Sequence, residues 1–402
     1  MKVCVIGAGI VGCSAAYHLA RAGHAVHLVD AGSGPGQLTS FANGAQLSYS
    51  YVEPFATPAT LRSLPTMLLS ATSPVRFRLR ADWRQWTWLM QFLRACDRQT
   101  AQRGTVWLLE LAQLSRRTLD AWLAEEKWDV SFRQNGKLVL CPDAATLRRQ
   151  EAQVRLQMGH GCRQEVLSAA DCLRKEPALG LSATEFAGGV WTADECVADP
   201  HRLCEALLRS LHQRGGTSTF GVTVQSFVRE GSRFIAARST AGDIHADAFV
   251  LAAGPHAAAL ASGFGMRLPI YPIKGYSITL PIKADARSPQ ASVTDLKRKT
   301  VFAPLDGRMR VAAMAEITGY DPGIQSARVQ EMLRSVEAVY PGLCEPGDPQ
   351  AWAGLRPATP TSLPIIGRMR DTNMFFNVGH GALGLTLAAG SAMRLAGALQ
   401  PA

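Results

Sequence analysis

In the first thirty residues, the spacing of hydrophobic residues changes from that of a strand to that of a helix and then back to that of a strand. Val3 to Ile6 is a short apolar run that predicts a buried strand, and a glycine-rich turn follows it. Apolar residues then recur at helical spacing to about Ala22, and a second apolar run from Ala25 to Val29 ends in Asp30. The pattern therefore predicts a strand, a helix and a second strand in direct succession, which is a βαβ unit.

Further strands and helices are indicated by the same reasoning along the rest of the chain. Asp199-Pro200 is typical of a helix start, and a strand-like stretch from Thr217 to Val228 follows that helix. The run from Ala248 to Ala253 predicts a buried strand that ends in small residues, as where backbone approaches a ligand. Near the C-terminus, an apolar strand from Phe375 to Val378 leads through a second glycine-rich turn into an apolar helix.

Composition excludes several classes of protein. The chain has 402 residues, 47% of them hydrophobic, which suits two or three compact units. Its net charge of +10 comes without a long run of like charges or a nucleic-acid motif, so we expect no nucleic-acid partner. Nine cysteines without a CxxC pair argue against disulfides and against a metal site. We expect a cytoplasmic protein with reduced thiols and without a membrane-spanning helix, since polar residues interrupt every apolar stretch.

The first glycine-rich turn has the spacing of a nucleotide site. In Gly7-Ala8-Gly9-Ile10-Val11-Gly12, the first glycine permits the tight turn, the second lets the backbone approach a pyrophosphate, and the third lets the helix pack on the strand. The helix N-terminus faces the phosphate charge. Asp30 ends the second strand, where its carboxylate can accept hydrogen bonds from ribose hydroxyls. These residues predict a dinucleotide but do not distinguish FAD from NAD.

Five further motifs follow in a fixed order over nearly the whole chain. They are Thr39 to Ser48 (TSFANGAQLS), Tyr271 to Ser277 (YPIKGYS), Met314 to Glu316 (MAE), Gly354 to Pro357 (GLRP) and Gly379 to Gly384 (GHGALG). In this order they resemble the D-amino acid dehydrogenase branch of the FAD-dependent amine and amino acid oxidoreductases, the superfamily that also holds the glycine and sarcosine oxidases.

The resemblance implies a cofactor and a fold. The cofactor is FAD, and the fold is α/β of mixed α+β type, in which a Rossmann-like FAD-binding domain is interleaved with a substrate domain built on an antiparallel sheet with helices. Residues 1–48, 195–268 and 341–402 would form the FAD-binding domain, and residues 49–194 and 269–340 the substrate domain. The stretch from about 97 to 190 has helical patterning but no recognisable chemistry, so we expect it to be scaffold.

By the same resemblance, both glycine-rich turns and the segments between them hold the cofactor. Thr39 to Gln46 would line the inner side of the flavin, Val224 would present its backbone to the adenine, and Gly379 to Thr386 would lie by the pyrimidine end and the ribityl chain. The complete set is Gly7, Ala8, Gly9, Ile10, Val11, Gly12, Asp30, Ala31, Thr39, Ser40, Asn43, Gly44, Ala45, Gln46, Leu47, Val224, Ala253, Gly254, Gly354, Arg356, Gly379, His380, Gly381, Ala382, Leu383, Gly384, Leu385 and Thr386.

The implied reaction is oxidation of the Cα–N bond of a D-amino acid to a 2-oxo acid and ammonia, by hydride transfer to the flavin. A substrate carboxylate taken out of water needs a cationic partner, and Arg356 is the first candidate. Tyr276 and Tyr271 could add a phenolic hydrogen bond, and Lys274 could steady the flavin. The structural alternatives are a salt bridge for Arg356, a core position for Tyr271 and a solvated position for Lys274.

An acid or base is not required if the substrate amine is neutral when it is oxidised. His380 belongs to a residue type that titrates near neutrality, but its place in a glycine motif favours contact with the flavin. Glu316 either lines the pocket or caps the substrate sheet. Two departures from the family pattern concern the substrate more than the cofactor: Thr361 stands where an acidic residue is common, and Leu385 stands where an aromatic is common.

Several functions share these motifs. The alternatives are an oxidase of glycine or sarcosine, a dehydrogenase of a cyclic D-imino acid such as D-proline or hydroxy-D-proline, and a flavin-binding subunit whose own pocket is inactive. The resemblance favours a quinone or another non-oxygen acceptor. Residues 61–94 mix tryptophans with arginines, which suits peripheral contact with the cytoplasmic face of the inner membrane. The alternative is that these tryptophans pack inside the substrate domain.

Overall fold

Two large β-sheets carry the fold, and the computed structural model describes residues 1–69 and 75–400 of the chain. The first sheet has six strands in the order β19, β20, β13, β1, β2, β9, and every neighbouring pair except β19 with β20 is parallel. Its strands are β1 (Lys2–Ile6), β2 (Ala25–Val29), β9 (Thr217–Thr219), β13 (Ala248–Leu251), β19 (Ile365–Arg368) and β20 (Met374–Val378). The parallel part is the Rossmann-like half of the expected fold.

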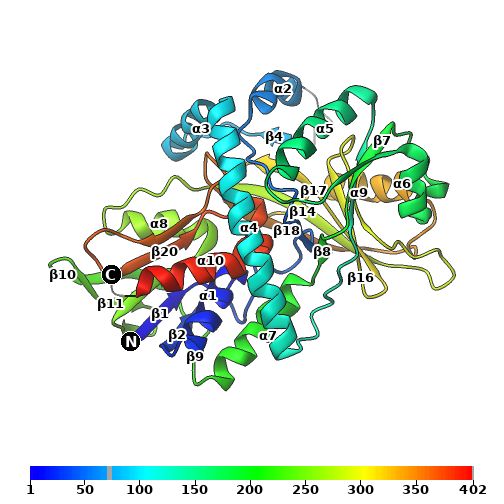
Figure 1. Cartoon of the computed structure of the whole chain (residues 1–402). Coiled ribbons are helices and arrows are strands. Elements are labelled where there is room, and N and C mark those ends of the chain that lie inside the picture. The colour runs from blue at the N-terminus through cyan, green and yellow to red at the C-terminus, as the bar shows by residue number, and fades with distance from the viewer. Residues whose placement is uncertain (70–74, 401–402) are drawn as a thin grey trace.

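Helices cover this sheet and bury its strands. The helix α1 (Ile10–Arg21) connects β1 to β2, so the βαβ unit predicted from the apolar pattern is confirmed. It packs against α10 (Gly384–Leu399) and α7 (Pro200–Gln213), and α10 packs against the long helix α4 (Arg98–Glu126). Figure 1 shows α4 crossing the front of the molecule, between the first sheet and the second.

One predicted strand is in fact two strands in different sheets. The stretch from Thr217 to Val228 forms β9 and then enters β10 (Val224–Glu230). With β11 (Arg233–Ser239) and β12 (Gly242–His245), β10 makes a separate antiparallel sheet of three strands. Between β9 and β10, Gly221 has a φ of +71°, a left-handed conformation that turns the chain. Apolar periodicity does not reveal this turn because the residues on both sides of it are strand formers.

The second large sheet has nine strands and is mostly antiparallel. Its order is β18, β14, β17, β16, β15, β5, β7, β6, with β4 beside β17. The strands are β4 (Val75–Phe77), β5 (Lys137–Cys141), β6 (Glu165–Ser168), β7 (Gly188–Thr192), β14 (Tyr271–Pro281), β15 (Ser292–Asp295), β16 (Thr300–Leu305), β17 (Arg308–Ile317) and β18 (Gln350–Ala358). A short pair, β3 (Gln46–Leu47) and β8 (Cys196–Val197), lies apart from it.

The position of β18 corrects one expected domain boundary. This strand lies in the stretch 341–402 that we expected in the FAD-binding domain, but it pairs with β14 in the second sheet, from Tyr271 opposite Ala358 to Thr279 opposite Gln350. The physical reason is that the edge of β14 not paired with β17 offers backbone hydrogen bonds to an antiparallel strand. The chain returns to the first sheet only at β19.

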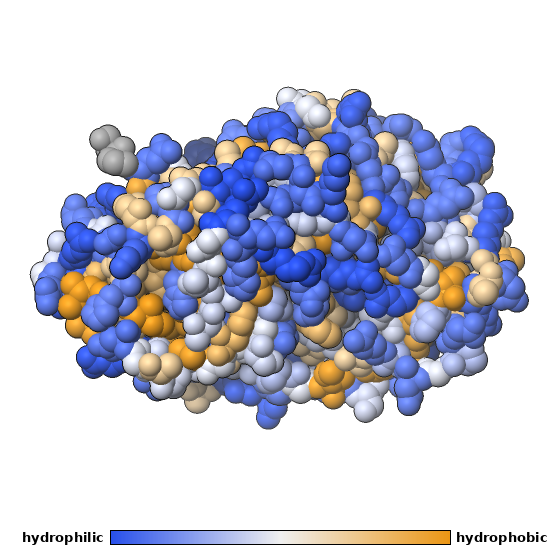
Figure 2. Space-filling model, turned by 90° about the horizontal axis from the view of Figure 1, so that it is seen from below, coloured by the Kyte–Doolittle hydropathy of each residue, from blue (hydrophilic) through white to orange (hydrophobic). Residues whose placement is uncertain are grey.

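Most of the remaining helices flank the second sheet or lie at the ends of the molecule, whereas α8 packs against strands of the first sheet. In Figure 1, α2 and α3 lie at the top, and α5 and α6 lie beside the outer strands. Their bounds, with those of α8 and α9, are α2 (Pro58–Leu69), α3 (Trp83–Ala95), α5 (Ala144–Met158), α6 (Ala169–Lys175), α8 (Ala257–Ser262) and α9 (Ser326–Val339). Figure 2 shows the underside of the molecule, where hydrophilic side chains dominate and the apolar patches are small and separate.

The C-terminal helix α10 is long and mostly apolar. The window Gly381–Leu399 has the length and apolarity of a membrane span, but most of it is buried inside the protein. It packs against α1 and α4, and residues such as Leu387, Ala392 and Leu395 are fully buried there. A helix that is apolar on every face and buried is also typical of the core of a globular protein.

Gly390 is a point of very close approach between α10 and α4. A Cβ at this position would lie 2.7 Å from the carbonyl oxygen of Leu111 and 2.8 Å from the amide nitrogen of Ser115. We expect Gly390→Ala to lower the free energy of unfolding by about 1–3 kcal/mol, because the helices must move apart. The control Gly397→Ala, where no described atom lies within 4 Å, should raise it by up to about 1 kcal/mol. Denaturant unfolding of both variants checks this, and equal stabilities would contradict the close packing.

Candidate active site

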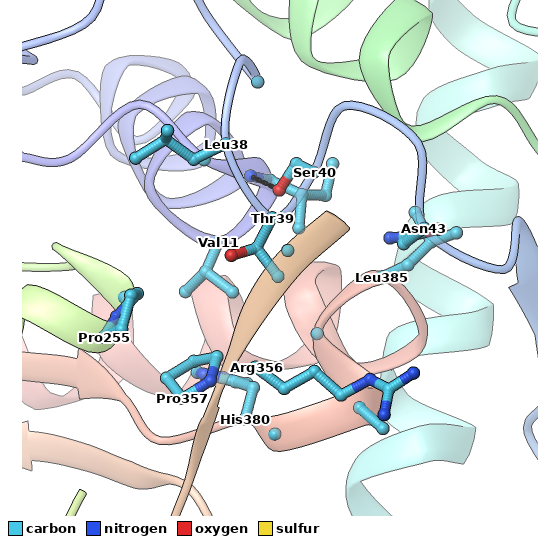
Figure 3. A pocket seen from close by; sticks show the side chains of 18 of the residues that line it. Val11, Leu38, Thr39, Ser40, Asn43, Pro255, Arg356, Pro357, His380 and Leu385 are labelled. Atoms are coloured by element: carbon cyan, nitrogen blue, oxygen red, sulfur yellow. Dashed lines mark hydrogen bonds between the residues drawn. The ribbon is translucent and has the colours of Figure 1, made fainter. Parts of the chain in front are cut away.

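A cavity of about 830 Å³ lies where the two sheets meet. Its walls come from β1 and the turn after it, from the segment 34–48, from the ends of β13 and β20, and from β14, β17 and β18. In Figure 3, Thr39, Ser40 and Asn43 lie on one side of the cavity, and Arg356 and His380 lie on the other. A volume of this size suits a large organic cofactor together with a small substrate.

The glycine turn after β1 is shaped as the sequence predicted. Gly7 has a φ of +108°, and a Cβ there would lie 2.5 Å from the Ala252 carbonyl oxygen. A Cβ on Gly12 would overlap the carbonyl oxygen of Gly7, so the third glycine is required by packing. Gly9 lines the cavity at the start of α1, where free backbone N–H groups and the helix dipole favour an anionic phosphate.

Asp30 and Ser40 hold this turn in place. The Asp30 carboxylate accepts the Ala8 N–H at 2.6 Å and the Gly32 N–H at 2.7 Å, and the Ser40 hydroxyl accepts the Ile10 N–H at 2.9 Å. Asp30 lines the cavity at the carboxyl end of β2. Each of its carboxylate oxygens has a further lone pair, so the carboxylate can also accept a ribose hydroxyl.

Asn377 shows that the cavity fits a polar ligand. This residue is the last but one of the otherwise apolar strand β20, is 1% exposed and lines the cavity. Neither its side-chain nitrogen nor its side-chain oxygen has a hydrogen-bond partner among the described residues. A buried amide without partners is costly, so we expect a bound group to satisfy it. Together with the glycine turn and Asp30, this residue fits the dinucleotide FAD.

Arg356 reaches the cavity from β18 and is held by backbone. Its Nη1 donates to the Met314 carbonyl oxygen at 2.8 Å. Met314 lies at a register shift between β14 and β17, and its φ of +71° is unusual for a residue with a side chain. A Cβ on Gly275 would overlap the guanidinium, so glycine at this position lets Arg356 lie flat on β14. No carboxylate in the described part of the chain pairs with Arg356.

Burial lowers the pKa of Arg356 to about 10, so the guanidinium is still charged at neutral pH. A charged group without a counter-ion in a buried cavity is unfavourable until an anion joins it. The arrangement therefore favours capture of a carboxylate. A structural salt bridge, the alternative considered from the sequence, is not what the structure shows.

Tyr276 lines the cavity, but its hydroxyl group points to a buried ion cluster behind it. The Tyr276 hydroxyl donates to Glu316 Oε2 at 3.0 Å, and Arg328 Nε donates to Glu316 Oε1 at 2.8 Å. Lys274 Nζ lies 3.8 Å from the same carboxylate and donates to the Gly323 carbonyl oxygen at 3.0 Å. Glu316 thus anchors the phenol, and the expected phenolic hydrogen bond to a substrate carboxylate is not available in this arrangement.

Two other expected residues lie outside the cavity. Lys274 is fully buried in the ion cluster with Glu316, so it is neither solvated nor in contact with the cavity. Tyr271 is also buried, with its hydroxyl 3.3 Å from Asp82 Oδ2 and its ring beside Trp88, so the core alternative describes it. The two corrections have different causes. Tyr271 lies on the opposite face of β14 from Tyr276, because successive residues of a strand alternate between faces. Lys274 shares a face with Tyr276, but its amine lies beside Glu316 in the ion cluster.

Most of the expected cofactor residues line the cavity, and a few support it from behind. Gly12 and Leu47 do not line it, because Gly12 packs on Gly7 and Leu47 lies in the hydrophobic core. His380 lines it, but its Nε2 lies 2.8 Å from the Ser391 hydroxyl, and burial lowers its pKa to about 3. It therefore stays neutral and does not act as a base near neutrality.

Sequence reasoning missed Asn377 and Lys137 as cavity residues. Each is a lone polar side chain inside or next to an apolar strand, in MFFNV and KLVLC. That pattern is the available signal, since a polar residue in a fully buried strand needs a partner. The strand alone does not tell which face of the sheet holds the partner.

Comparisons with known proteins place the chain among flavoenzymes. The family model described as DAO, FAD dependent oxidoreductase, matches residues 2–398. The D-amino acid dehydrogenase 2 of Pseudomonas aeruginosa is 44% identical over 400 residues, which cover 98% of this chain and 94% of that protein. The protein of the same name from Ralstonia nicotianae is 41% identical over 406 residues, which cover 98% of this chain and 96% of that protein.

Solved structures share the fold at low identity. Glycine oxidase from Geobacillus kaustophilus has a TM-score of 0.78 at 19% identity, covering 99% of this chain and 94% of that one. Iminodiacetate oxidase from Chelativorans has a TM-score of 0.74 at 24% identity, covering 100% and 96%. The expected fold class and the expected FAD cofactor are confirmed. The chain belongs to the DAO family of FAD-dependent oxidoreductases.

Proposed function

We propose that this chain oxidises the Cα–N bond of D-amino acids to 2-oxo acids and ammonia, and that a quinone or another non-oxygen acceptor takes the electrons. Two relatives at 44% and 41% identity are named D-amino acid dehydrogenase 2, and both are covered over more than nine tenths of their length. The observation that carries the proposal is Arg356, a partly buried cation that lines the cavity and has no carboxylate partner among the described residues.

The side chains divide the work around the substrate. Arg356 binds the substrate carboxylate, and Met314 and Gly275 fix the orientation of its guanidinium. Bound FAD supplies the hydride acceptor. Tyr276, anchored by Glu316, forms a rigid wall that excludes water from the substrate. His380 stays neutral beside Ser391 and contributes a hydrogen-bonding surface rather than a proton.

Anaerobic bleaching of the flavin absorption tests the proposed substrate class. D-alanine, D-proline, L-alanine and glycine are added to the purified holoenzyme in separate cuvettes. We expect D-alanine or D-proline to bleach the oxidised band and L-alanine to leave it unchanged. Bleaching by glycine alone would assign the chain to glycine oxidation instead, and bleaching by L-alanine would overturn the stereochemical claim. Rapid reoxidation by air without an added acceptor would overturn the claim of a non-oxygen acceptor.

Gly275→Ala tests the positioning of Arg356 without removing it. The added methyl group overlaps the guanidinium and has to displace it from the Met314 carbonyl oxygen. We expect the KM for D-alanine to rise at least about tenfold, because a misplaced carboxylate partner weakens substrate binding. Flavin content should stay unchanged. The matched control is Gly180→Ala, where no described atom lies within 4 Å of the added carbon, and its KM should equal that of the wild type. A wild-type KM for Gly275→Ala would contradict this role for Arg356.

The peripheral membrane contact is a second part of the proposal, and α3 supports it. Residues 70–74 of the stretch 61–94, and the side chains of Met67, Leu68 and Leu69, lie outside what the structure describes. Trp88 and Phe92 are buried, which agrees with the alternative that aromatic residues of this stretch pack inside the substrate domain. Exposed apolar side chains remain beside exposed arginines, and they are Leu79 (62%), Trp83 (59%), Trp86 (45%) and Met90 (51%). Arginines beside exposed tryptophans suit an anionic lipid surface.

Sedimentation with anionic phospholipid vesicles tests this contact. We expect the double variant Trp83→Ala, Trp86→Ala to bind at least about tenfold more weakly than the wild type, because two half-exposed indoles no longer insert. The control is Met158→Ala with Leu181→Ala, two exposed apolar residues far from α3 in the sequence. Equal partitioning of wild type and the tryptophan variant would remove the basis of the proposed contact.

A further inference from the structure

Lys137 is a buried cation in the wall of the cavity. It belongs to none of the motifs described above and has no role in the proposed function so far. It is the first residue of β5, an otherwise apolar strand, and it is 4% exposed. Lysine is almost never buried to this degree unless its ammonium group has partners. On the neighbouring strands, Thr192 of β7 and Ser292 of β15 lie opposite Lys137, and both carry only hydroxyl groups.

Two side chains contact the Lys137 amine, and a buried carboxylate influences it electrostatically. Nζ donates to the Ser48 hydroxyl at 2.9 Å, and it lies 4.4 Å from the centre of the Tyr51 ring. Ser48 and Tyr51 line the cavity as well. Behind them lies Glu195, 1% exposed, whose Oε1 accepts the Ser50 N–H at 2.7 Å. Glu195 Oε2 is buried and has no hydrogen-bond partner in the described part of the chain.

Apart from the exposed side chains of His256 and Lys299, the other ionisable groups that line the cavity are unsuited to accept a proton near neutrality. Both oxygens of Asp30 accept backbone N–H groups of the nucleotide turn, and Arg356 keeps its proton. His380 is paired with Ser391 and has a pKa of about 3. Burial raises the pKa of the phenols, Tyr51 and Tyr276. The side chains of His256 and Lys299 are exposed.

We propose that Lys137 is a catalytic residue that takes a proton from the α-ammonium group of the substrate, with Glu195 as the buried counter-charge that stabilises the resulting lysine cation. This inference rests on the proposed oxidation of amino acids. The substrate N–H bond breaks and a Lys137 N–H bond forms. The substrate α-ammonium group thereby becomes a neutral amine, and the neutral Lys137 amine becomes an ammonium group. The lone pair left on the substrate nitrogen then assists departure of hydride from Cα.

The charges that face Lys137 set the pH at which it can accept this proton. Burial lowers the pKa of Lys137 to about 8, and the Glu195 carboxylate opposes that shift. Burial raises the pKa of the Glu195 carboxyl, and the Lys137 charge opposes that shift in turn. Lys137 is protonated below its pKa and accepts a proton only above it. Turnover should therefore rise with pH through about 8, and removing the Glu195 charge should move the rise to lower pH.

The test compares the pH dependence of kcat for D-alanine, under saturating artificial acceptor, in the wild type, Lys137→Gln and Glu195→Gln. We expect Lys137→Gln to lose about 100-fold in kcat and to lose the rise near pH 8. Glu195→Gln should keep that rise and shift it to lower pH. Titration of free D-alanine is common to all three proteins, so only differences between them count. The control Lys297→Met, an exposed lysine outside the cavity, should match the wild type.

Binding of propionate, followed by its perturbation of the flavin band, provides a readout apart from turnover. Propionate has the carboxylate but no amine, so Lys137→Gln should bind it as the wild type does. A wild-type pH profile for Lys137→Gln, or a rise that stays at the same pH in Glu195→Gln, would overturn the proposal. If Lys137→Gln fails to fold, the shift in Glu195→Gln decides alone. If no amino acid bleaches the flavin absorption of the wild type, the proposed function itself is refuted.

Discussion

The organisation of the cavity depends on one partly buried guanidinium, Arg356, that has no carboxylate beside it in the described part of the chain. A charge in such a place is unfavourable unless its hydrogen bonds are met and an anion can reach it. Arg356 meets this requirement through the Met314 carbonyl oxygen and the flat surface of Gly275. The pairing of β18 with β14, the register shift in β17 and the left-handed Met314 all serve to place this one group.

The two sheets contribute different charges to the same cavity. Among the described residues that line the cavity, the only carboxylate is Asp30, which comes from the first sheet and organises the glycine turn at the start of α1. From the second sheet and its turns come Lys137, Lys299 and Arg356. A phosphate-binding turn thus faces a group of cations, which suits a negatively charged cofactor and a carboxylate substrate. The division follows from topology, because parallel strands end at a nucleotide turn and antiparallel strands place side chains inward.

Buried ion clusters lie behind the cavity and keep its walls in place. Glu316, Arg328 and Lys274 hold Tyr276, and Glu195 lies behind Lys137. Removal of one member would leave an uncompensated charge in the interior, which is far more unfavourable than loss of an exposed salt bridge.

The sequence by itself determined the cofactor side of this protein. Gly7, Gly9, Gly12 and Asp30 lie within thirty residues, and local backbone geometry dictates their spacing, so a linear pattern is sufficient to identify them. The motif around Arg356 was equally readable, but its orientation was not. Only the tertiary structure decided that Lys274 and Tyr271 point away from the cavity while Lys137 lines it. Strand register and the choice of sheet face depend on partner strands that lie far away in the sequence, and no local pattern records them.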